Sequence, residues 1–425
     1  MHRMLILLIA AIAPPASSGN AVTIAVTPQI SMLDRRVAIA VHAPPGNRVA
    51  LHLQTERFGM VFESDATVVT PPSGTFTLDD MGLFWSALAT HPAARGAQFN
   101  RSSDLDPRPY TISARAGGTE QSSTLVRTAL DPTTLRTVVD HGSFVATLFS
   151  GKDGVCRPAA IVLGGSEGGV PEEQAAVIAS HGFTTLALAY FGAAGLPKFL
   201  ENIPIETVSR AIVFMRANAA VCRNRRLAIV GGSKGAELAL VAASTFRDIG
   251  AVVAMKPSSV VFSGLGPATA ASSWSYHGKP LPFANGTVPQ AVYDRISADR
   301  KNHRQVAYTP MYLAQLQNNT DEAAIIPVEK IAGPILLVAG GSDELWPSLQ
   351  MANAIMRRLK SPKRSYGDRL LSYSDAGHSI GIPFGFAKAE LAHGELALGG
   401  TPEANELASE DAWSKIMQFL KANAF

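Results

Sequence analysis

The stretch GGSKGAEL, residues 231–238, lies where two kinds of local pattern meet. Before it, residues 227–230 (LAIV) form an apolar run that predicts a buried strand. From its last glycine onward, residues 235–245 (GAELALVAAST) predict a helix. A buried strand that turns tightly into a helix is a building unit of α/β folds with a parallel sheet. The stretch therefore predicts the fold class of the part of the chain around it.

Within this turn, Gly231, Ser233 and Gly235 fit the pattern G-x-S-x-G. Glycines at the flanking positions let the strand and the helix approach closely, and the serine is forced into a strained turn that pushes its hydroxyl above the sheet. The helix N-terminus beside it favours developing negative charge. The pattern and its setting predict that Ser233 is a nucleophile and that Gly231 and Gly235 form its nucleophile elbow.

A nucleophilic serine needs a base to remove its proton and an acid to orient that base. At an elbow of this kind, the order along the chain is serine, acid, histidine. The segment ILLVAGGSDELW leads to Asp343, and the segment LLSYSDAGHSIG leads to His378. Asp343 and His378 are the predicted acid and base, because both follow predicted strands at the edge where open α/β sheets build their sites. Glu344 and Asp375 are the competing acids.

An acyl-transfer site also needs N–H donors for the oxyanion. One predicted donor is the backbone N–H of Lys234, the residue after the nucleophile. The other is a backbone N–H of Ser166 or Glu167 in AAIVLGGSEGG, because the glycines of this loop let the backbone approach a substrate oxygen. A plain turn after a strand is the alternative for this loop. The Lys234 side chain is expected to face solvent, and contact with a substrate phosphate is its alternative role.

The chain has two parts with different patterns. From residue 21 to 130, short runs with partial period-two alternation are separated by turn-rich pieces, which predicts a β-sandwich domain. From 131 to 425, nearly continuous apolar runs alternate with helical patterns, which predicts an α/β domain with a mostly parallel sheet and helices on both faces. Residues 263–328 are rich in Pro, Gly, Ser and Asn, and we interpret them as a lid over the site or a structural insertion.

The N-terminus has the layout of a secretory signal peptide. Arg3 is followed by an apolar run and then by small residues, so residues 1–20 are expected to direct export to the periplasm or the medium and to be removed. An uncleaved anchor or a first core strand is the alternative, and without a signal the protein would be cytoplasmic. The two cysteines, Cys156 and Cys222, each precede a predicted strand, which allows one disulfide in an exported chain. Two separate thiols are the alternative.

The composition argues against several classes of function. The chain has 425 residues, 47% of them apolar and 17% charged, which suits a protein with a large buried core. The net charge of +3 is small for this length and no basic run is interleaved with aromatics, so nucleic acid is not an expected partner. No segment of the mature chain is long and apolar enough to predict a membrane span. No metal and no other cofactor is expected, because His, Cys and acidic residues show no metal-ligand spacing.

Together these motifs resemble the acyl-CoA thioesterases and bile acid-CoA:amino acid N-acyltransferases. The resemblance covers nearly the whole mature chain. It rests on RRVAIAVHAPPGNRVALHLQ and MGLFWSAL in the N-terminal part, and on GGSEGG, FTTLALAYF, GGSKGAELAL, SSWSYHGKPLPF, IPVEKIAGPILLVAGGSDELWPS and DAGHSIG in the C-terminal part. It implies that an all-β, immunoglobulin-like sandwich precedes an α/β-hydrolase domain.

The resemblance further implies hydrolysis of acyl-CoA-type thioesters to free fatty acid and CoA, with Ser233 as nucleophile, His378 as base and Asp343 as orienting acid. The family's transferases carry cysteine at the nucleophile position, so the serine favours water as the acceptor. CoA is chiefly a cytosolic carrier, whereas the N-terminus predicts export. The first alternative is therefore a periplasmic or secreted carboxylesterase of broad acyl specificity, and the second is a non-catalytic binding protein on a hydrolase scaffold. The expected partner is a small-molecule acyl thioester or ester.

Overall fold

The computed structural model describes residues 21–423 with several internal gaps. Outside the description lie residues 1–20, 58, 80, 92–103, 141, 143, 224–225, 269–270, 361–363, 386–395 and 424–425. The predicted signal peptide, residues 1–20, therefore lies outside the described residues. Among the helices of the described part, none combines the length and the apolar character needed to cross a membrane.

The N-terminal part is a sandwich of two β-sheets with the strand orders β1-β3-β6 and β2-β9-β8-β4-β5-β7. Along β4, buried side chains alternate with more exposed ones, and Val49, Leu51 and Leu53 are buried. They share one apolar cluster with Ile39 and Val41 of the other sheet, so the alternation marks the core. The elements are β1 (Thr23–Thr27), β2 (Ile30–Met32), β3 (Ala38–His42), β4 (Arg48–Arg57), β5 (Met60–Val69), β6 (Thr75–Leu78), α1 (Gly82–Trp85), β7 (Leu88–His91), β8 (Arg108–Ala116) and β9 (Thr119–Thr128).

The C-terminal part is built on an eight-stranded sheet of order β10-β11-β13-β12-β15-β16-β19-β20. Adjacent strands are parallel along the order β13-β12-β15-β16-β19-β20. At the other side of the sheet, β10 pairs antiparallel with β11, and β11 pairs antiparallel with β13. The apolar runs of the sequence are buried throughout β12, β13, β16 and β19, as a sheet covered on both faces requires. The strands are β10 (Thr134–Asp140), β11 (Val145–Gly151), β12 (Ala159–Leu163), β13 (Thr184–Ala189), β15 (Leu227–Gly232), β16 (Ile249–Met255), β19 (Ile335–Gly340) and β20 (Arg369–Tyr373).

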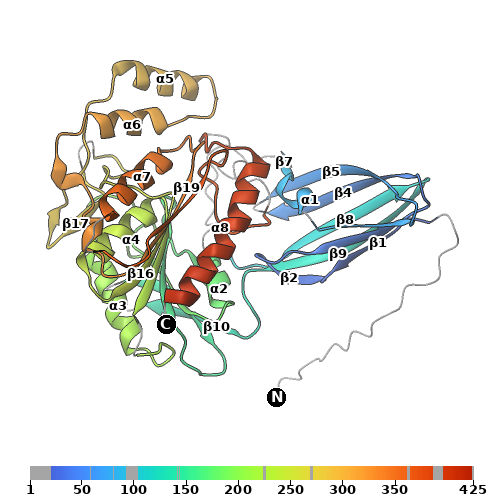
Figure 1. The fold of residues 1–425 in the computed structure, drawn as a ribbon, viewed down its shortest axis with the longest axis horizontal. Coiled ribbons are helices and arrows are strands. Elements are labelled where there is room, and N and C mark those ends of the chain that lie inside the picture. Colours follow the sequence, from blue (N-terminus) through green and yellow to red (C-terminus); the bar gives the residue numbers. More distant parts are fainter. Residues whose placement is uncertain are drawn as a thin grey trace.

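Two layers of helices cover this sheet. On β12, Ile161 and Leu163 join one apolar cluster with α3, α4 and α7, whereas Ala160 and Val162 join another with α2 and α8. The helices are α2 (Glu172–Ala179), α3 (Glu206–Ala217), α4 (Lys234–Thr245), α7 (Ser348–Leu359) and α8 (Pro402–Asn423). Figure 1 shows the sandwich beside this part, with α8 along the side nearest the sandwich. The expected class, an α/β-hydrolase domain preceded by a β-sandwich, is confirmed.

Residues 263–328 lie between β16 and β19 and contain more regular structure than their composition indicated. The insertion carries β17 (Trp274–Tyr276), β18 (Lys279–Pro280), α5 (Gln290–Lys301), α6 (Thr309–Gln317), the 3₁₀ turn η2 (Glu322–Ala324) and the start of η3 (Val328–Lys330), and β17 also pairs with β14 (Ile203–Pro204). In Figure 1, α5 and α6 stand at the end of the α/β part that is far from the sandwich. The hydroxyl of Thr309 donates to the Asp343 carbonyl at 2.8 Å, so α6 begins beside the predicted acid.

A disulfide joins Cys156 to Cys222, which confirms the pairing that the sequence allowed. The bridge lies beside the short contact between Arg157 and Val221, just before β12 and ahead of β15. Since β12 and β15 are neighbours in the sheet, the cross-link ties together the starts of the two strands that lead to the predicted oxyanion loop and the predicted elbow.

The double variant Cys156→Ser/Cys222→Ser is expected to be less stable. The cysteines are 66 residues apart, and a closed loop of that size corresponds to about 4 kcal/mol in the free energy of unfolding. The check is urea unfolding followed by tryptophan fluorescence, with the dithiothreitol-reduced wild type as the matched control. Equal unfolding midpoints for the oxidised wild type and the double variant would contradict the expectation.

Candidate active site

Ser233 occupies the turn between β15 and α4 with φ 56° and ψ −123°, a strained combination for a residue with a side chain. Its amide donates to the Met255 carbonyl at 2.9 Å, which fixes the turn to β16. A Cβ on Gly231 would lie 2.2 Å from the Gly235 carbonyl oxygen, and a Cβ on Gly235 would lie 2.1 Å from the Gly164 carbonyl oxygen. Both approaches exclude a side chain, so the backbone itself requires glycine at these two positions.

Asp343 and His378 form a buried, hydrogen-bonded pair. The His378 Nδ1 lies 2.9 Å from Asp343 Oδ2 and 3.1 Å from Oδ1. The same carboxylate accepts the amides of Leu345 at 3.0 Å and Trp346 at 3.2 Å on Oδ1, and the Ser348 hydroxyl at 2.6 Å on Oδ2. These donors hold the carboxylate in one orientation, and the carboxylate in turn fixes the imidazole through its Nδ1. The other ring nitrogen, Nε2, is not in contact with this carboxylate.

The two competing acids lie elsewhere. Glu344 and Asp375 are both exposed, and neither is hydrogen-bonded to His378 within the described part of the chain. The carboxylate of Asp375 instead accepts the hydroxyl of Ser374 at 3.1 Å. Of the three acids that the sequence offered, the structure brings Asp343 to the histidine.

Ser233 and His378 follow the carboxyl ends of parallel strands, β15 and β20, in one sheet. In the described residues no hydrogen bond joins the serine hydroxyl to the imidazole, and hydrogen bonds of this kind are often long before substrate binds. Lys256 connects the two segments. Its ammonium donates to the Ile380 carbonyl at 2.7 Å, and a Cβ on Gly232 would lie 3.4 Å from the same nitrogen.

The loop after β12 lies against the elbow, since a Cβ on Gly165 would be 3.4 Å from the Cβ of Ser233. Ser166 and Glu167 stand exposed at the tip of this loop. Their backbone N–H groups, and that of Lys234, donate to no acceptor among the residues that the structure describes. All three predicted donors are therefore available to a substrate oxygen.

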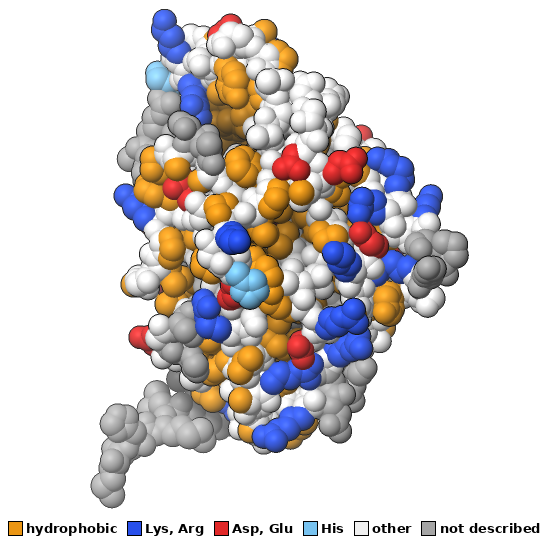
Figure 2. Space-filling view, turned by 90° about the vertical axis from the view of Figure 1, so that its left-hand side faces the viewer, with side chains coloured by type: hydrophobic (Ala, Val, Ile, Leu, Met, Phe, Trp, Pro, Cys, Tyr) orange, Lys and Arg blue, Asp and Glu red, His pale blue; other side chains and the backbone are white. Residues whose placement is uncertain are grey.

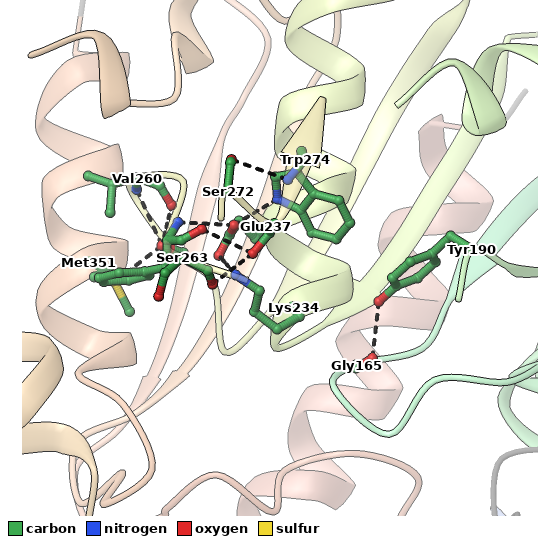
Figure 3. Close-up of polar contacts among 12 residues, drawn as sticks. Gly165, Tyr190, Lys234, Glu237, Val260, Ser263, Ser272, Trp274 and Met351 are labelled. Carbon is green, nitrogen blue, oxygen red and sulfur yellow. Dashed lines mark hydrogen bonds and ion pairs between the residues drawn. The ribbon is translucent and has the colours of Figure 1, made fainter. Parts of the chain in front are cut away.

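Tyr190 is hydrogen-bonded to the loop after β12. Its hydroxyl lies 2.7 Å from the Gly164 carbonyl oxygen and 3.1 Å from that of Gly165, and its one proton is shared between these two acceptors. Figure 3 shows the contact with Gly165. Burial raises the pKa of Tyr190 well above its ordinary value, so the hydroxyl remains a donor at every working pH. The ring packs at a steep angle on Trp274, with 5.5 Å between the ring centroids.

The expectation that the Lys234 side chain faces solvent is wrong, because only 3% of the residue is exposed. Its ammonium lies 2.8 Å from Glu237 Oε2, while Glu237 Oε1 accepts the indole N–H of Trp274 at 2.7 Å and the amide of Phe262 at 3.2 Å. Figure 3 shows these groups turned toward one another. Burial lowers the pKa of Lys234 and raises that of Glu237, and their mutual attraction opposes both changes.

Sequence reasoning missed four residues of this site: Tyr190, Glu237, Trp274 and Lys256. One signal was present, since Glu237 is an acid within an otherwise apolar helical segment and stands three residues after Lys234. For Tyr190, Trp274 and Lys256, the partners come from distant parts of the chain, and no local pattern indicates them.

The variant Tyr190→Phe is expected to lower kcat about tenfold and to change KM little, because two carbonyls lose a donor worth about 1 kcal/mol and the loop loses its fixed position. Steady-state kinetics on an acyl thioester is the check. Thr185→Val is the matched control, since the Thr185 hydroxyl also donates to a buried carbonyl, that of Ala175 at 2.8 Å, but does not touch the loop. Similar losses of kcat in both variants would contradict a specific role for Tyr190.

Comparison with known proteins gives a consistent assignment. Residues 203–424 match the family model described as BAAT / Acyl-CoA thioester hydrolase C terminal. Acyl-coenzyme A amino acid N-acyltransferase 1 of Mus musculus is 28% identical over 93% of this chain and 96% of its own length. Acyl-coenzyme A thioesterase 6 of Homo sapiens is 27% identical over 81% of this chain and 80% of its own. The peroxisomal succinyl-coenzyme A thioesterase of Mus musculus is 28% identical over 84% and 82%.

The family model spans residues 203–424, more than half of the chain, and includes the elbow, the Asp343–His378 pair and the insertion between β16 and β19. The matches to the individual relatives extend it over most of the remainder, including the sandwich. The resemblance drawn from the motifs is thus confirmed. The chain belongs to the BAAT and acyl-CoA thioester hydrolase family.

Proposed function

We propose that this protein is a serine hydrolase of acyl-CoA-type thioesters, with Ser233 as nucleophile, His378 as base and Asp343 as orienting acid. The observation that carries the proposal is the buried pair of His378 and Asp343, at 2.9 Å, beside the same sheet edge as the strained turn of Ser233. Relatives named as acyl-coenzyme A thioesterases support a thioester as the substrate.

In the first half of the proposed reaction, His378 takes the hydroxyl proton of Ser233 while the oxygen attacks the carbonyl carbon of the thioester. The oxyanion is stabilised by the N–H of Lys234 and by that of Ser166 or Glu167. When the intermediate collapses, the C–S bond breaks and His378 gives the proton to the departing thiolate of CoA. The acyl group is then an ester on the serine oxygen.

In the second half, water attacks the acyl ester and His378 takes a proton from it. The ester bond breaks, the proton returns to the Ser233 oxygen and the free acid leaves. Asp343 stays ionised throughout, keeps the imidazole in place and stabilises the imidazolium that forms twice in each cycle. The same steps apply to an oxygen ester, because both substrates pass through a tetrahedral oxyanion.

The surface suits an anionic substrate. On the face seen in Figure 2, Lys and Arg side chains gather over the right-hand and lower parts, with hydrophobic side chains between them. A positively charged surface raises the local concentration of a substrate that carries phosphates, as CoA does. The comparison of a CoA thioester with a neutral ester of the same acyl chain, given below, tests whether this charge contributes to substrate binding.

Water is the proposed acceptor, although relatives include amino acid N-acyltransferases. The test is to incubate the purified protein with a long-chain acyl-CoA, with and without glycine or taurine, and to identify the acyl product. Free acid in both reactions supports hydrolysis, and an N-acyl amino acid as the main product would replace hydrolysis by transfer.

A carboxylesterase acting outside the cytoplasm is the second candidate, and the Cys156–Cys222 disulfide favours it. Such bonds persist in oxidising compartments, so we also propose that the chain is exported. The deciding experiment compares kcat/KM for a long-chain acyl-CoA and for the p-nitrophenyl ester of the same acid. A higher value for the thioester supports the first proposal, whereas turnover of the ester alone supports the second.

A further inference from the structure

The segment that follows His378 runs from the large sheet to the β-sandwich. The amide of Gly381 donates to the hydroxyl of Ser409 on α8 at 3.1 Å. Phe384 is only 5% exposed, and its side chain belongs to the apolar core of the sandwich rather than to either core of the α/β part. Residues 379–384, here called the histidine loop, thus connect the predicted base to the other domain.

Arg127, on β9 of the sandwich, is hydrogen-bonded to the C-terminal end of this loop. Its Nη1 donates to the Phe384 carbonyl at 2.6 Å, and its Cζ lies 5.8 Å from the centroid of the Phe384 ring. Its Nη2 donates to three carbonyls of the sandwich itself, those of Met32, Leu33 and Arg35. One buried side chain therefore fastens the histidine loop to the edge of the sandwich.

Two features of this contact cost free energy unless other interactions compensate for them. Arg127 is fully buried, and in the described part of the chain it forms no salt bridge, so its carbonyl acceptors are needed to offset the loss of hydration. Phe384 has a φ of 62°, a backbone conformation that bulky residues rarely adopt. The Phe384 carbonyl accepts from Arg127, the Phe384 amide donates to the Glu406 carboxylate on α8, and the ring packs in the core of the sandwich, so these contacts together maintain both features.

Other contacts join the sandwich to the α/β part, so the sandwich that carries Arg127 is itself fixed relative to the large sheet. Asp34 Oδ2 lies 2.5 Å from His181 Nε2 and accepts the indole N–H of Trp413 at 3.0 Å. Nearby, the guanidinium of Arg36 pairs with Glu410 on α8, with Nε 2.6 Å from Oε1. The contacts of Asp34 are buried and the Arg36–Glu410 pair is partly exposed, and both join the sandwich to helices or loops of the α/β part.

We propose that the β-sandwich positions the catalytic base: Arg127 holds the Phe384 end of the histidine loop and thereby sets where His378 stands relative to Ser233. This inference rests on the proposed function of His378. Arg127 touches neither the substrate nor the reacting atoms and is a positioning residue. The sandwich is then part of the active site's support rather than a separate recognition module.

The test is the variant Arg127→Met in the full chain, which keeps a long apolar stem and removes the donors. At a temperature well below its unfolding midpoint, kcat on an acyl thioester is expected to fall on the order of 10-fold to 100-fold, with KM within about twofold, because a small displacement of a catalytic group is enough for such losses. Labelling of Ser233 by a fluorophosphonate is expected to slow by the same factor, since it needs the same base.

Arg364→Met is the matched control. The Arg364 side chain is also buried and also donates to two carbonyls, those of Ile331 at 2.6 Å and Gly333 at 2.8 Å, which lie at the amino end of β19, away from the strand ends that lead to the site. Unlike Arg127, it also pairs with a carboxylate, that of Asp368 at 2.6 Å, so this control tests the loss of a buried guanidinium at least as severely. It is expected to lose stability while it keeps kcat and the labelling rate. If Arg127→Met does not fold, Phe384→Leu takes its place with the same expected losses.

The inference is overturned if a folded Arg127→Met or Phe384→Leu protein turns over and is labelled at the wild-type rate, or if Arg364→Met loses as much kcat. Failure of the proposed function has a different signature: either the wild type itself does not hydrolyse thioesters, or Ser233→Ala retains the activity, whatever Arg127 does.

Discussion

Replacing Ser233 by alanine is expected to lower kcat for thioester hydrolysis by about 10⁶-fold, which leaves only the residual acceleration of about 10³-fold that oxyanion donors and substrate binding provide. The reason is that every covalent step of the proposed reaction passes through the serine oxygen. The oxyanion donors and the Asp343–His378 pair stay in place in this variant, because the alanine Cβ occupies the position of the serine Cβ and the backbone keeps its turn. Steady-state assays with a long-chain acyl-CoA and labelling with a fluorophosphonate measure the effect.

Ser244→Ala is the matched control for this experiment. Ser244 lies on the same helix, α4, and its hydroxyl donates to the Val241 carbonyl at 2.8 Å within that helix. Its loss is expected to leave kcat and labelling within about twofold of the wild type, as for most surface-side substitutions away from a site. Substantial thioesterase activity in folded Ser233→Ala would show that the nucleophile lies elsewhere.

Replacing Asp343 by asparagine is expected to lower kcat by about 10⁴-fold at neutral pH. The amide has the shape of the carboxylate, but it carries no charge to stabilise the imidazolium. Its NH₂ group also favours the tautomer of His378 that has its proton on Nε2, which then cannot accept the serine proton. KM is expected to change little, because Asp343 is buried behind the imidazole.

The neighbouring acids provide the controls for this second prediction. Glu344→Gln and Asp375→Asn remove exposed carboxylates that do not contact the imidazole, and both are expected to keep kcat within about twofold of the wild type. A large loss in Glu344→Gln together with a small one in Asp343→Asn would reassign the acid and contradict the geometry at 2.9 Å.

Much of the site could be predicted because its determinants are local. The elbow is specified within five residues, and its two glycines are required by backbone approaches of 2.1 and 2.2 Å that no side chain can enter. Asp343 and His378 could be found because each lies in the short loop after a strand, β19 and β20 respectively. The same holds for the cysteines, whose places before neighbouring parallel strands brought them together.

The rest depended on contacts between distant segments. Lys234 was expected in solvent because lysine is rarely buried, yet Trp274 of the insertion and Phe262 just before it complete a buried site around its partner Glu237. The regular structure in residues 263–328 was also missed, since the polar and small residues of α5 and α6 show no amphipathic pattern that would predict helices. The start of α6 lies beside the site, where Thr309 donates to the Asp343 carbonyl. The hydrogen bond from Arg127 to the Phe384 carbonyl joins residues 257 positions apart, and no local sequence pattern predicts it.

The most direct test of the central claim is to trap the acyl-enzyme. The protein is mixed with a long-chain acyl-CoA, quenched in acid during the steady state, digested and analysed by mass spectrometry. The account predicts an acyl group of the substrate's mass on the peptide that contains Ser233, and none in Ser233→Ala. Turnover of the thioester with no acyl adduct on that peptide, or with the adduct on another residue, would contradict it.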